Sequence, residues 1–225
     1  MKKVFLTCRP ITESMATTWC GKTRKLLLDL GLGHIWYSGE VGSSRDWEKV
    51  IYPSIAAREL QEWRKELLKK DKLCLYRMIK TDLHRESYLS LPMDRRRRLT
   101  EMRCGTHCLD VEIGRWQQIA REVRFCRVCA CGPIEDELHV LLDCYQYRKL
   151  REQMIKTIET KTGYVLSVMD GDREWLRDFL LGCGVSDSKT RVTVAAVVGT
   201  FFNKALKRRK EILCQVSRVN VGLED

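Results

Sequence analysis

The sequence predicts a mainly α-helical fold: an irregular helical domain that holds one short insert rich in cysteine and histidine. Proline occurs only four times in 225 residues, so long helices are possible. Hydrophobic residues make up 44% of the chain and recur at helical spacing in several segments, so a core can form. The chain shows no internal repeat, so a solenoid of stacked units is not expected.

The first two helices are expected in the N-terminal third of the chain. Residues 12–30 carry apolar side chains at helical spacing, and the glycines of residues 31–33 are suited to end that helix. Ser44 or Asp46 is the expected N-cap of the second helix, over residues 47–69. We expect the proline within that segment to interrupt it.

The middle of the chain predicts shorter elements. Residues 73–79 have the spacing of a short helix. Residues 92–102 predict another, with its proline in the first turn, where proline is tolerated. Residues 104–125 are less regular. A long helix is expected over residues 136–161, starting inside the cysteine- and histidine-rich insert.

Two helices are expected near the C-terminus. Asp172 is a suitable N-cap for a helix over residues 173–181. Residues 188–215 predict a long final helix, although four valines between positions 192 and 198 make a strand the competing interpretation. The predicted organisation is therefore a helical region over residues 1–103, an insert module with its following helix over 104–160, and a helical region over 161–225.

The charge of the chain favours an anionic partner. Lys and Arg total 41 against 30 Asp and Glu, a formal net charge of +11. Such a surplus suits RNA or DNA before a membrane surface. The longest apolar stretch, residues 192–202, contains Thr and Gly and is too short to span a bilayer, so no membrane partner is expected.

The eleven cysteines are scattered along the chain and odd in number. A secreted disulfide scaffold would be shorter and richer in loops. We therefore expect an intracellular protein, of the nucleus or cytoplasm, whose thiols stay reduced and bind metal rather than form disulfides.

The insert carries the pattern Cys126-x2-Cys129-x9-His139-x4-Cys144. Thiolate and imidazole ligands in two short pairs suit one tetrahedral zinc ion, which predicts a CCHC zinc knuckle. Acids at 135–137 suit the N-terminal dipole of the helix that carries His139. Four protein ligands leave no open position, so the expected Zn²⁺ is structural. The competing interpretation is a set of ordinary buried cysteines beside a surface histidine.

Four further residues bear on the ligand set. Cys131 lies two residues after Cys129 and is an alternative ligand, although this spacing is less favourable. Cys104, His107 and Cys108 form a second candidate set, but no partner pair lies near them in the sequence.

The residues around this pattern match a known family. Gly-Arg-Trp at 114–116 precedes Arg-Phe-Cys-Arg-Val-Cys at 124–129, Glu-Asp-Glu-Leu-His at 135–139 and Cys-Tyr-Gln-Tyr-Arg-Lys-Leu-Arg at 144–151. This run resembles the zinc-knuckle region near the C-terminus of non-LTR (LINE-type) retrotransposon polyproteins, downstream of the reverse transcriptase. The resemblance covers residues 15–155, with a fairly specific centre and diffuse flanks.

The resemblance implies a fragment that grips RNA or target DNA, with the polymerase portion of a parent polyprotein as a further partner. The chain departs from the family in lacking a Tyr-x-Asp-Asp polymerase motif and a nuclease constellation, so no enzyme activity is expected. Tyr145 stands where the family usually has a proline after the last knuckle cysteine.

The expected nucleic-acid contacts are basic residues in two runs and beside the knuckle. They are Arg95, Arg96, Arg97, Arg98, Arg115, Arg121, Arg124, Arg127, Lys207, Arg208, Arg209 and Lys210. Neutralising several phosphates at once releases counterions, but such runs are also common as solvated helix faces. Trp116 is expected to be a buried anchor rather than a base-stacking residue. The alternative function is a zinc-stabilised helical adaptor that binds protein, favoured by abundant large apolar residues at helical spacing.

Overall fold

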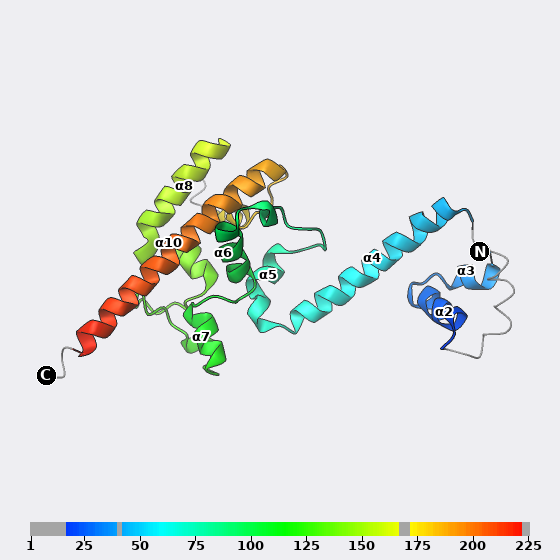
Figure 1. The fold of residues 1–225 in the computed structure, drawn as a ribbon, viewed down its shortest axis with the longest axis horizontal. Helices are drawn as coiled ribbons and strands as arrows, with labels where there is room; N and C mark the ends of the chain where they lie inside the picture. The colour runs from blue at the N-terminus through cyan, green and yellow to red at the C-terminus, as the bar shows by residue number, and fades with distance from the viewer. Residues whose placement is uncertain (1–16, 40–41, 167–171, 222–225) are drawn as a thin grey trace. The chain divides into compact units, whose positions relative to one another are not determined.

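The computed structural model describes residues 17–39, 42–166 and 172–221, with side chains described as far as residue 215. The chain divides into two compact units, Met1–Lys69 and Lys70–Asp225. The fold is mainly α, as predicted, and the described residues contain no strand beyond one isolated bridge between Phe125 and Ile134 (Figure 1).

The helices of the first unit are α2 (Trp19–Asp29), α3 (Gly33–Ser38) and α4 (Ser44–Leu68). Those of the second unit are α5 (Cys74–Ile79), α6 (Met93–Arg103), α7 (Asp110–Trp116), α8 (Arg148–Thr162), α9 (Arg173–Leu180) and α10 (Ser188–Val221). Short 3-10 turns cover η1 (Asp71–Leu73), η2 (Ser87–Ser90), η3 (Arg121–Val123) and η5 (Tyr145–Tyr147), and η4 (His139–Asp143) is a π-helical turn.

Helix α2 ends as the glycines predict. Gly31 adopts a φ of 71°, and the backbone N–H of Leu32 donates to Leu27 O at 2.7 Å, which closes a Schellman motif. The start differs, because α2 begins at Trp19, and residues 12–16 of the predicted helix lie outside the described residues. Around it, Cys20, Leu27 and Trp36 form the buried core of this unit.

The N-cap of helix α4 lies one residue before Ser44 and three before Asp46, the two predicted caps. Ser43 is the N-cap: its Oγ accepts from Asp46 N at 3.3 Å, and Asp46 Oδ2 accepts from Ser43 N at 2.9 Å. Asp46 therefore completes a capping box. The predicted interruption at Pro53 is wrong, since α4 continues through this residue. A proline inside a helix removes one backbone hydrogen bond, and here the neighbouring turns keep the helix intact.

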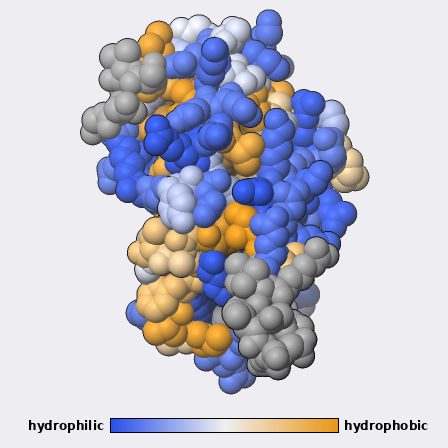
Figure 2. Space-filling view, turned by 90° about the vertical axis from the view of Figure 1, so that its left-hand side faces the viewer, coloured by the Kyte–Doolittle hydropathy of each residue, from blue (hydrophilic) through white to orange (hydrophobic). Residues whose placement is uncertain are grey.

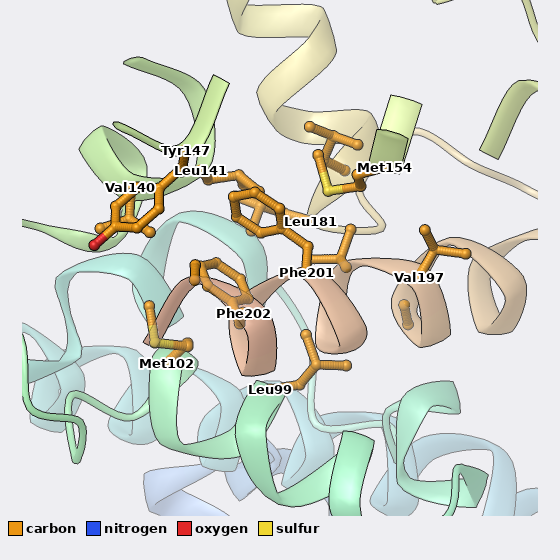
Figure 3. Packing of buried hydrophobic residues seen from close by; sticks show 14 of the residues in the cluster. Leu99, Met102, Val140, Leu141, Tyr147, Met154, Leu181, Val197, Phe201 and Phe202 are labelled. Atoms are coloured by element: carbon orange, nitrogen blue, oxygen red, sulfur yellow. The ribbon is translucent and has the colours of Figure 1, made fainter. Parts of the chain in front are cut away.

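Helix α10 is the centre of the second unit and packs mainly against α8 and α6. Figure 3 shows Phe201 and Phe202 of α10 between Leu99 and Met102 of α6 on one side and Leu141 on the other. The competing strand interpretation of its valines is wrong, because Val194 and Val198 are both fully buried at a spacing of four residues.

Other predicted elements are confirmed with small shifts of their ends. Asp172 caps α9, its Oδ1 accepting from Trp175 N at 2.8 Å. Pro92 precedes α6 as its N-cap. The predicted continuous helix over residues 136–161 is wrong: the chain forms the π-helical turn η4, a break at Cys144 and the turn η5 before α8 begins. Within the described part of the chain, none of the helices is both long enough and apolar enough to cross a membrane.

Candidate metal centre

Four buried side chains converge in the second unit, and they are the four that the sequence pattern predicts. Cys126, Cys129, His139 and Cys144 each offer one ligand atom, and these atoms all lie within 4.8 Å of one another. Cys129 Sγ lies 3.4 Å from His139 Nε2. In a tetrahedral zinc site, sulfur and nitrogen ligands stand about 3.5 Å apart and two sulfurs about 3.8 Å apart. The group can therefore hold a metal ion.

The first ligand pair is placed by a tight backbone turn. The N–H of Ala130 donates to Cys126 O at 2.9 Å, and Ala130 itself takes a left-handed φ of 51°. The second half of the loop is fixed by Cys126 N, which donates to Pro133 O at 2.8 Å. Both cysteines thus lie on one side of the loop, with their sulfurs turned inward.

The second ligand pair depends on the π-helical turn. Residues five apart on an α-helix lie about 140° apart around its axis, too far for His139 and Cys144 to share an ion. Instead, Cys144 N donates to His139 O at 2.7 Å, which closes an i to i+5 turn and brings both residues to one face. Asp136 starts the turn, because its Oδ1 accepts from His139 N at 2.9 Å.

Arg151 is a supporting residue that the sequence pattern did not reveal. From α8 its Nε donates to Leu141 O at 2.8 Å, and its terminal nitrogen donates to Cys144 O at 2.9 Å. A widened turn leaves carbonyl groups without helical partners, and Arg151 satisfies two of them. The guanidinium therefore fixes the backbone that carries the last ligand.

The electrostatic environment suits a cation. Burial raises the pKa of Cys129 to about 11. Hydrogen bonding to Cys144, together with burial, raises the pKa of Cys126 to about 12. The same hydrogen bond lowers the pKa of Cys144. Without an ion, the raised pKa values keep Cys126 and Cys129 protonated at neutral pH. A metal ion that stabilises thiolates would displace these protons on binding.

A buried ion network lies directly beside the cluster. Glu135 lies fully buried in the loop between the ligand pairs. Its Oε1 accepts from Arg209 Nε at 2.8 Å and its Oε2 accepts from Arg209 Nη2 at 2.7 Å, so α10 is bound to this loop. Asp110 completes the network: it accepts at 3.1 Å from the same terminal nitrogen of Arg209 that binds Glu135, and at 2.8 Å from Arg127. The expectation that Glu135 serves a helix dipole is therefore wrong, since its partners are Arg209 and the backbone N–H of Asp110.

The other candidate ligands lie outside the cluster. His107, whose side chain is fully buried, bonds Glu137 Oε1 through Nε2 at 2.7 Å and accepts from Leu109 N through Nδ1 at 3.3 Å. Cys108 and Cys131 are exposed. Among the described residues, the Cys126 group alone gathers three or more ligand atoms in this way, so Cys104, His107 and Cys108 form no second site.

The structure joins parts of the two predicted basic runs. Arg98 of α6 and Lys207, Arg209 and Lys210 of α10 line one open groove of about 710 Å³. Asn203 accepts a bond of 2.9 Å from Arg98 Nε, and Arg98 also pairs with Glu101 at 2.6 Å. Figure 2 shows one face of the molecule, with hydrophilic residues over most of it and hydrophobic ones between them. Two segments distant in sequence therefore contribute to one cationic surface.

Several predicted contacts are engaged elsewhere. Arg209 is 5% exposed, so its guanidinium is unavailable to a phosphate in this conformation. Arg124 donates all its bonds to backbone carbonyls, Ile119 O and Val111 O.

The rest are placed as follows. Arg95 lines a smaller pocket of about 280 Å³, Arg96 donates to Leu89 O, Arg97 pairs with Glu101, Arg115 with Glu112, Arg121 with Asp136, Arg127 with Asp110 and Arg208 with Glu211.

The prediction that Trp116 is a buried anchor is wrong. Its side chain is exposed at the end of α7, with the Arg115 guanidinium carbon 4.9 Å from the centroid of its ring.

The comparisons with known proteins add no family, since no family model, no curated protein and no solved structure matches the chain.

Proposed function

We propose that the protein is a zinc-stabilised module that grips RNA or DNA. The observation that carries the proposal is the groove that Arg98 of α6 lines together with Lys207 and Lys210 of α10. Clustered cations on a folded surface with a net charge of +11 are suited to phosphates. The resemblance to the post-polymerase region of LINE-type polyproteins supports the same function.

Zinc is the ion that the donor set fits best. Three thiolates and one imidazole are soft ligands, and the cluster offers four of them, buried and close enough for tetrahedral coordination. With all four positions taken by protein, the ion has no site for water or substrate. We therefore assign it a structural role and propose no enzymatic activity for this chain.

The ion network explains how zinc would support the groove. Glu135 lies in the loop between the two ligand pairs, and its carboxylate holds Arg209 of α10. Lys207 and Lys210, the groove cations of α10, lie within two residues of Arg209. A loop fixed by the ion therefore fixes the helix that presents these cations.

The partners follow from the same chemistry. RNA or DNA supplies the anion, and the polymerase portion of a parent polyprotein is a second partner that the resemblance implies. Thiolate ligands need a reducing compartment, so the nucleus or cytoplasm is the proposed location. The described helices give no reason to add a membrane to the partners.

The test combines metal content with salt-dependent binding. We expect one zinc per chain by elemental analysis, and oligonucleotide binding by fluorescence anisotropy that weakens steeply with salt. Replacing Lys207 and Lys210 by Gln removes two phosphate contacts, which lowers the slope of log K against log salt by about 1.4 for a single strand. Lys149→Gln with Lys156→Gln, two exposed lysines of α8 outside the groove, is the matched control.

The outcomes separate the proposal from the adaptor alternative. Nucleic-acid binding that does not depend on salt would contradict the proposal that the groove holds phosphates. Equal binding by the Lys207/Lys210 double variant and the Lys149/Lys156 control would contradict it as well. Association with protein that is insensitive to salt would instead favour the zinc-stabilised adaptor, because an apolar interface loses little affinity to counterions.

A further inference from the structure

The end of α7 and the segment that joins it to the first metal ligands expose large apolar side chains. Trp116 is 77% exposed, Val123 54% and Phe125 49%. Removing such side chains from water is favourable, so a partner that covered these three would gain free energy of binding. Exposed apolar side chains that gather in one segment are therefore typical of an interaction site. The metal cluster immediately after Phe125 has no need of these side chains, since it is already enclosed by other residues.

The segment is rigidly built. Gln118 takes a left-handed φ of 58°, and Ile119 N donates back to Gly114 O at 2.8 Å. Arg124 then clamps the turn, donating to Ile119 O at 2.6 and 2.9 Å and to Val111 O at 2.7 Å. A Cβ at position 114 would stand 2.7 Å from Arg124 Cγ, so only glycine fits beneath the clamp. These contacts fix the backbone around Trp116 before any partner arrives.

Arginine covers part of the exposed ring. The Arg115 guanidinium carbon lies 4.9 Å from the ring centroid of Trp116, and Glu112 holds that guanidinium through bonds of 3.0 and 2.7 Å. A fixed cation against a tryptophan ring is one half of the stack that unpaired nucleic-acid bases extend. The remaining exposed surface of the ring is available to such a base.

The charge around the ring is complementary to a phosphate backbone. Residues 115–127 contain four arginines and a single acid, Glu122. The side chains of Arg121 and Arg127 are 45% and 58% exposed, each in an ion pair with one aspartate. The Arg121–Asp136 pair is partly exposed and contributes little stability, so Arg121 is able to turn to a phosphate, whereas Arg127 stays paired with the buried Asp110 and adds positive charge to the same segment.

We propose that residues 115–127 form a stacking platform for the unpaired bases of single-stranded nucleic acid, with Trp116 as its main ring. This inference rests on the proposed nucleic-acid function and specifies the substrate class. A rigid exposed ring reaches the face of a base only where that base is unpaired, because duplex bases already stack on their neighbours. A phosphate beside the stacked bases then meets Arg121.

The test uses Trp116→Ala in the full chain with zinc present. Loss of one stacked base weakens binding to an unstructured oligo(dT) or oligo(U) by about 5- to 150-fold, while the slope against salt stays unchanged because no phosphate contact is lost. Binding to a duplex of equal length stays within about twofold. Trp116→Phe keeps a ring and restores most of the affinity. Trp19→Ala, which removes another exposed tryptophan in the first unit, leaves single-strand binding unchanged.

An oligonucleotide with abasic sites provides the second arm. Removing bases weakens binding to the parent protein but makes little difference to Trp116→Ala, because the ring and the base act as one contact. Equal binding of parent and Trp116→Ala to the intact single strand, with weaker binding of the lysine-pair variant, overturns the platform and leaves the proposed function standing.

Two other outcomes also count against the platform. If the parent protein binds no oligonucleotide at all, the proposed function and the platform both fail. If Trp116→Ala abolishes self-association in sedimentation without changing oligonucleotide binding, the exposed ring is a protein interface instead.

Discussion

Replacing Arg209 by Met tests the link between the metal loop and α10. The Arg209 side chain is 6% exposed and binds both oxygens of Glu135, whose side chain is fully buried. Methionine keeps the apolar stem of the side chain and removes its charge. Glu135 is then left with one hydrogen bond, from the backbone N–H of Asp110 at 2.8 Å.

The expected loss is large because a buried carboxylate loses its cation. Breaking a buried pair by removing one partner costs about 3–5 kcal/mol. Unit 2 spans residues 70–225, a size at which each kcal/mol shifts the melting temperature by about 2–4 °C. The melting temperature should therefore fall by about 6–20 °C. Arg208→Met, at an exposed neighbour that pairs only with Glu211 at 3.7 Å, should change stability by less than about 0.5 kcal/mol.

Urea unfolding and calorimetry on the zinc-loaded protein measure the effect. The double variant Arg209→Met with Glu135→Gln should recover most of the loss, because the neutral amide still accepts from Asp110 N and the remaining buried carboxylate, Asp110, keeps Arg127 as its partner. A loss below about 1 kcal/mol for Arg209→Met, or a double variant no more stable than the single one, would refute the argument that this pair anchors α10.

The same variant has a predicted pH dependence. Burial raises the pKa of Glu135, against the opposing effect of Arg209. Without Arg209 the pKa of Glu135 in the native state rises further above its value in the unfolded state. As the pH falls, Glu135 therefore takes up a proton in the native state at a higher pH than in the unfolded state. The destabilisation of Arg209→Met, measured against the parent, should therefore shrink as the pH falls through that raised pKa and grow as the pH rises.

Three further predictions concern the metal loop and a helix cap. Zinc affinity, measured by competition with a chelator, should fall by at least about tenfold per unit between pH 8 and pH 6, because the raised pKa values of Cys126 and Cys129 mean that binding displaces their protons; a flat profile would exclude them as ligands. Arg151→Met should lower stability by about 1–3 kcal/mol and weaken zinc retention, since it frees the carbonyls of the π-helical turn; unchanged retention would separate Arg151 from the site. Ser43→Ala should cost about 1 kcal/mol, seen as faster amide exchange confined to the start of α4; unchanged exchange there would argue against the capping box.

The features that the sequence predicted are those whose causes are local. The glycine stop after α2, the Asp172 cap and the spacing of Val194 and Val198 each depend on residues within one or two turns. The metal group was found for the same reason, since its ligands lie in one short segment whose spacing reflects the geometry of an ion.

The features that it missed depend on distant contacts. A π-helical turn at His139 needs Arg151 of the next helix to satisfy its carbonyls, and no local propensity announces this. The exposure of Trp116 depends on the clamp by Arg124 and on the glycine beneath it, whereas apolar character alone predicted burial. Pro53 was expected to break a helix that its neighbours sustain.

The basic run of α10 shows why charge runs mislead when the face of the helix is unknown. Arg209 lies about 200° around the helix from Lys207, whereas Lys210 lies only about 60° from it. Lys207 and Lys210 therefore share the groove side, and Arg209 turns inward to Glu135. The run thus divides its cations between surface and anchor. Loss of the Arg209–Glu135 pair is expected to disturb the groove even though Arg209 makes no phosphate contact. Nucleic-acid binding by Arg209→Met should therefore weaken in proportion to its loss of stability. The slope against salt should stay unchanged as long as α10 remains packed.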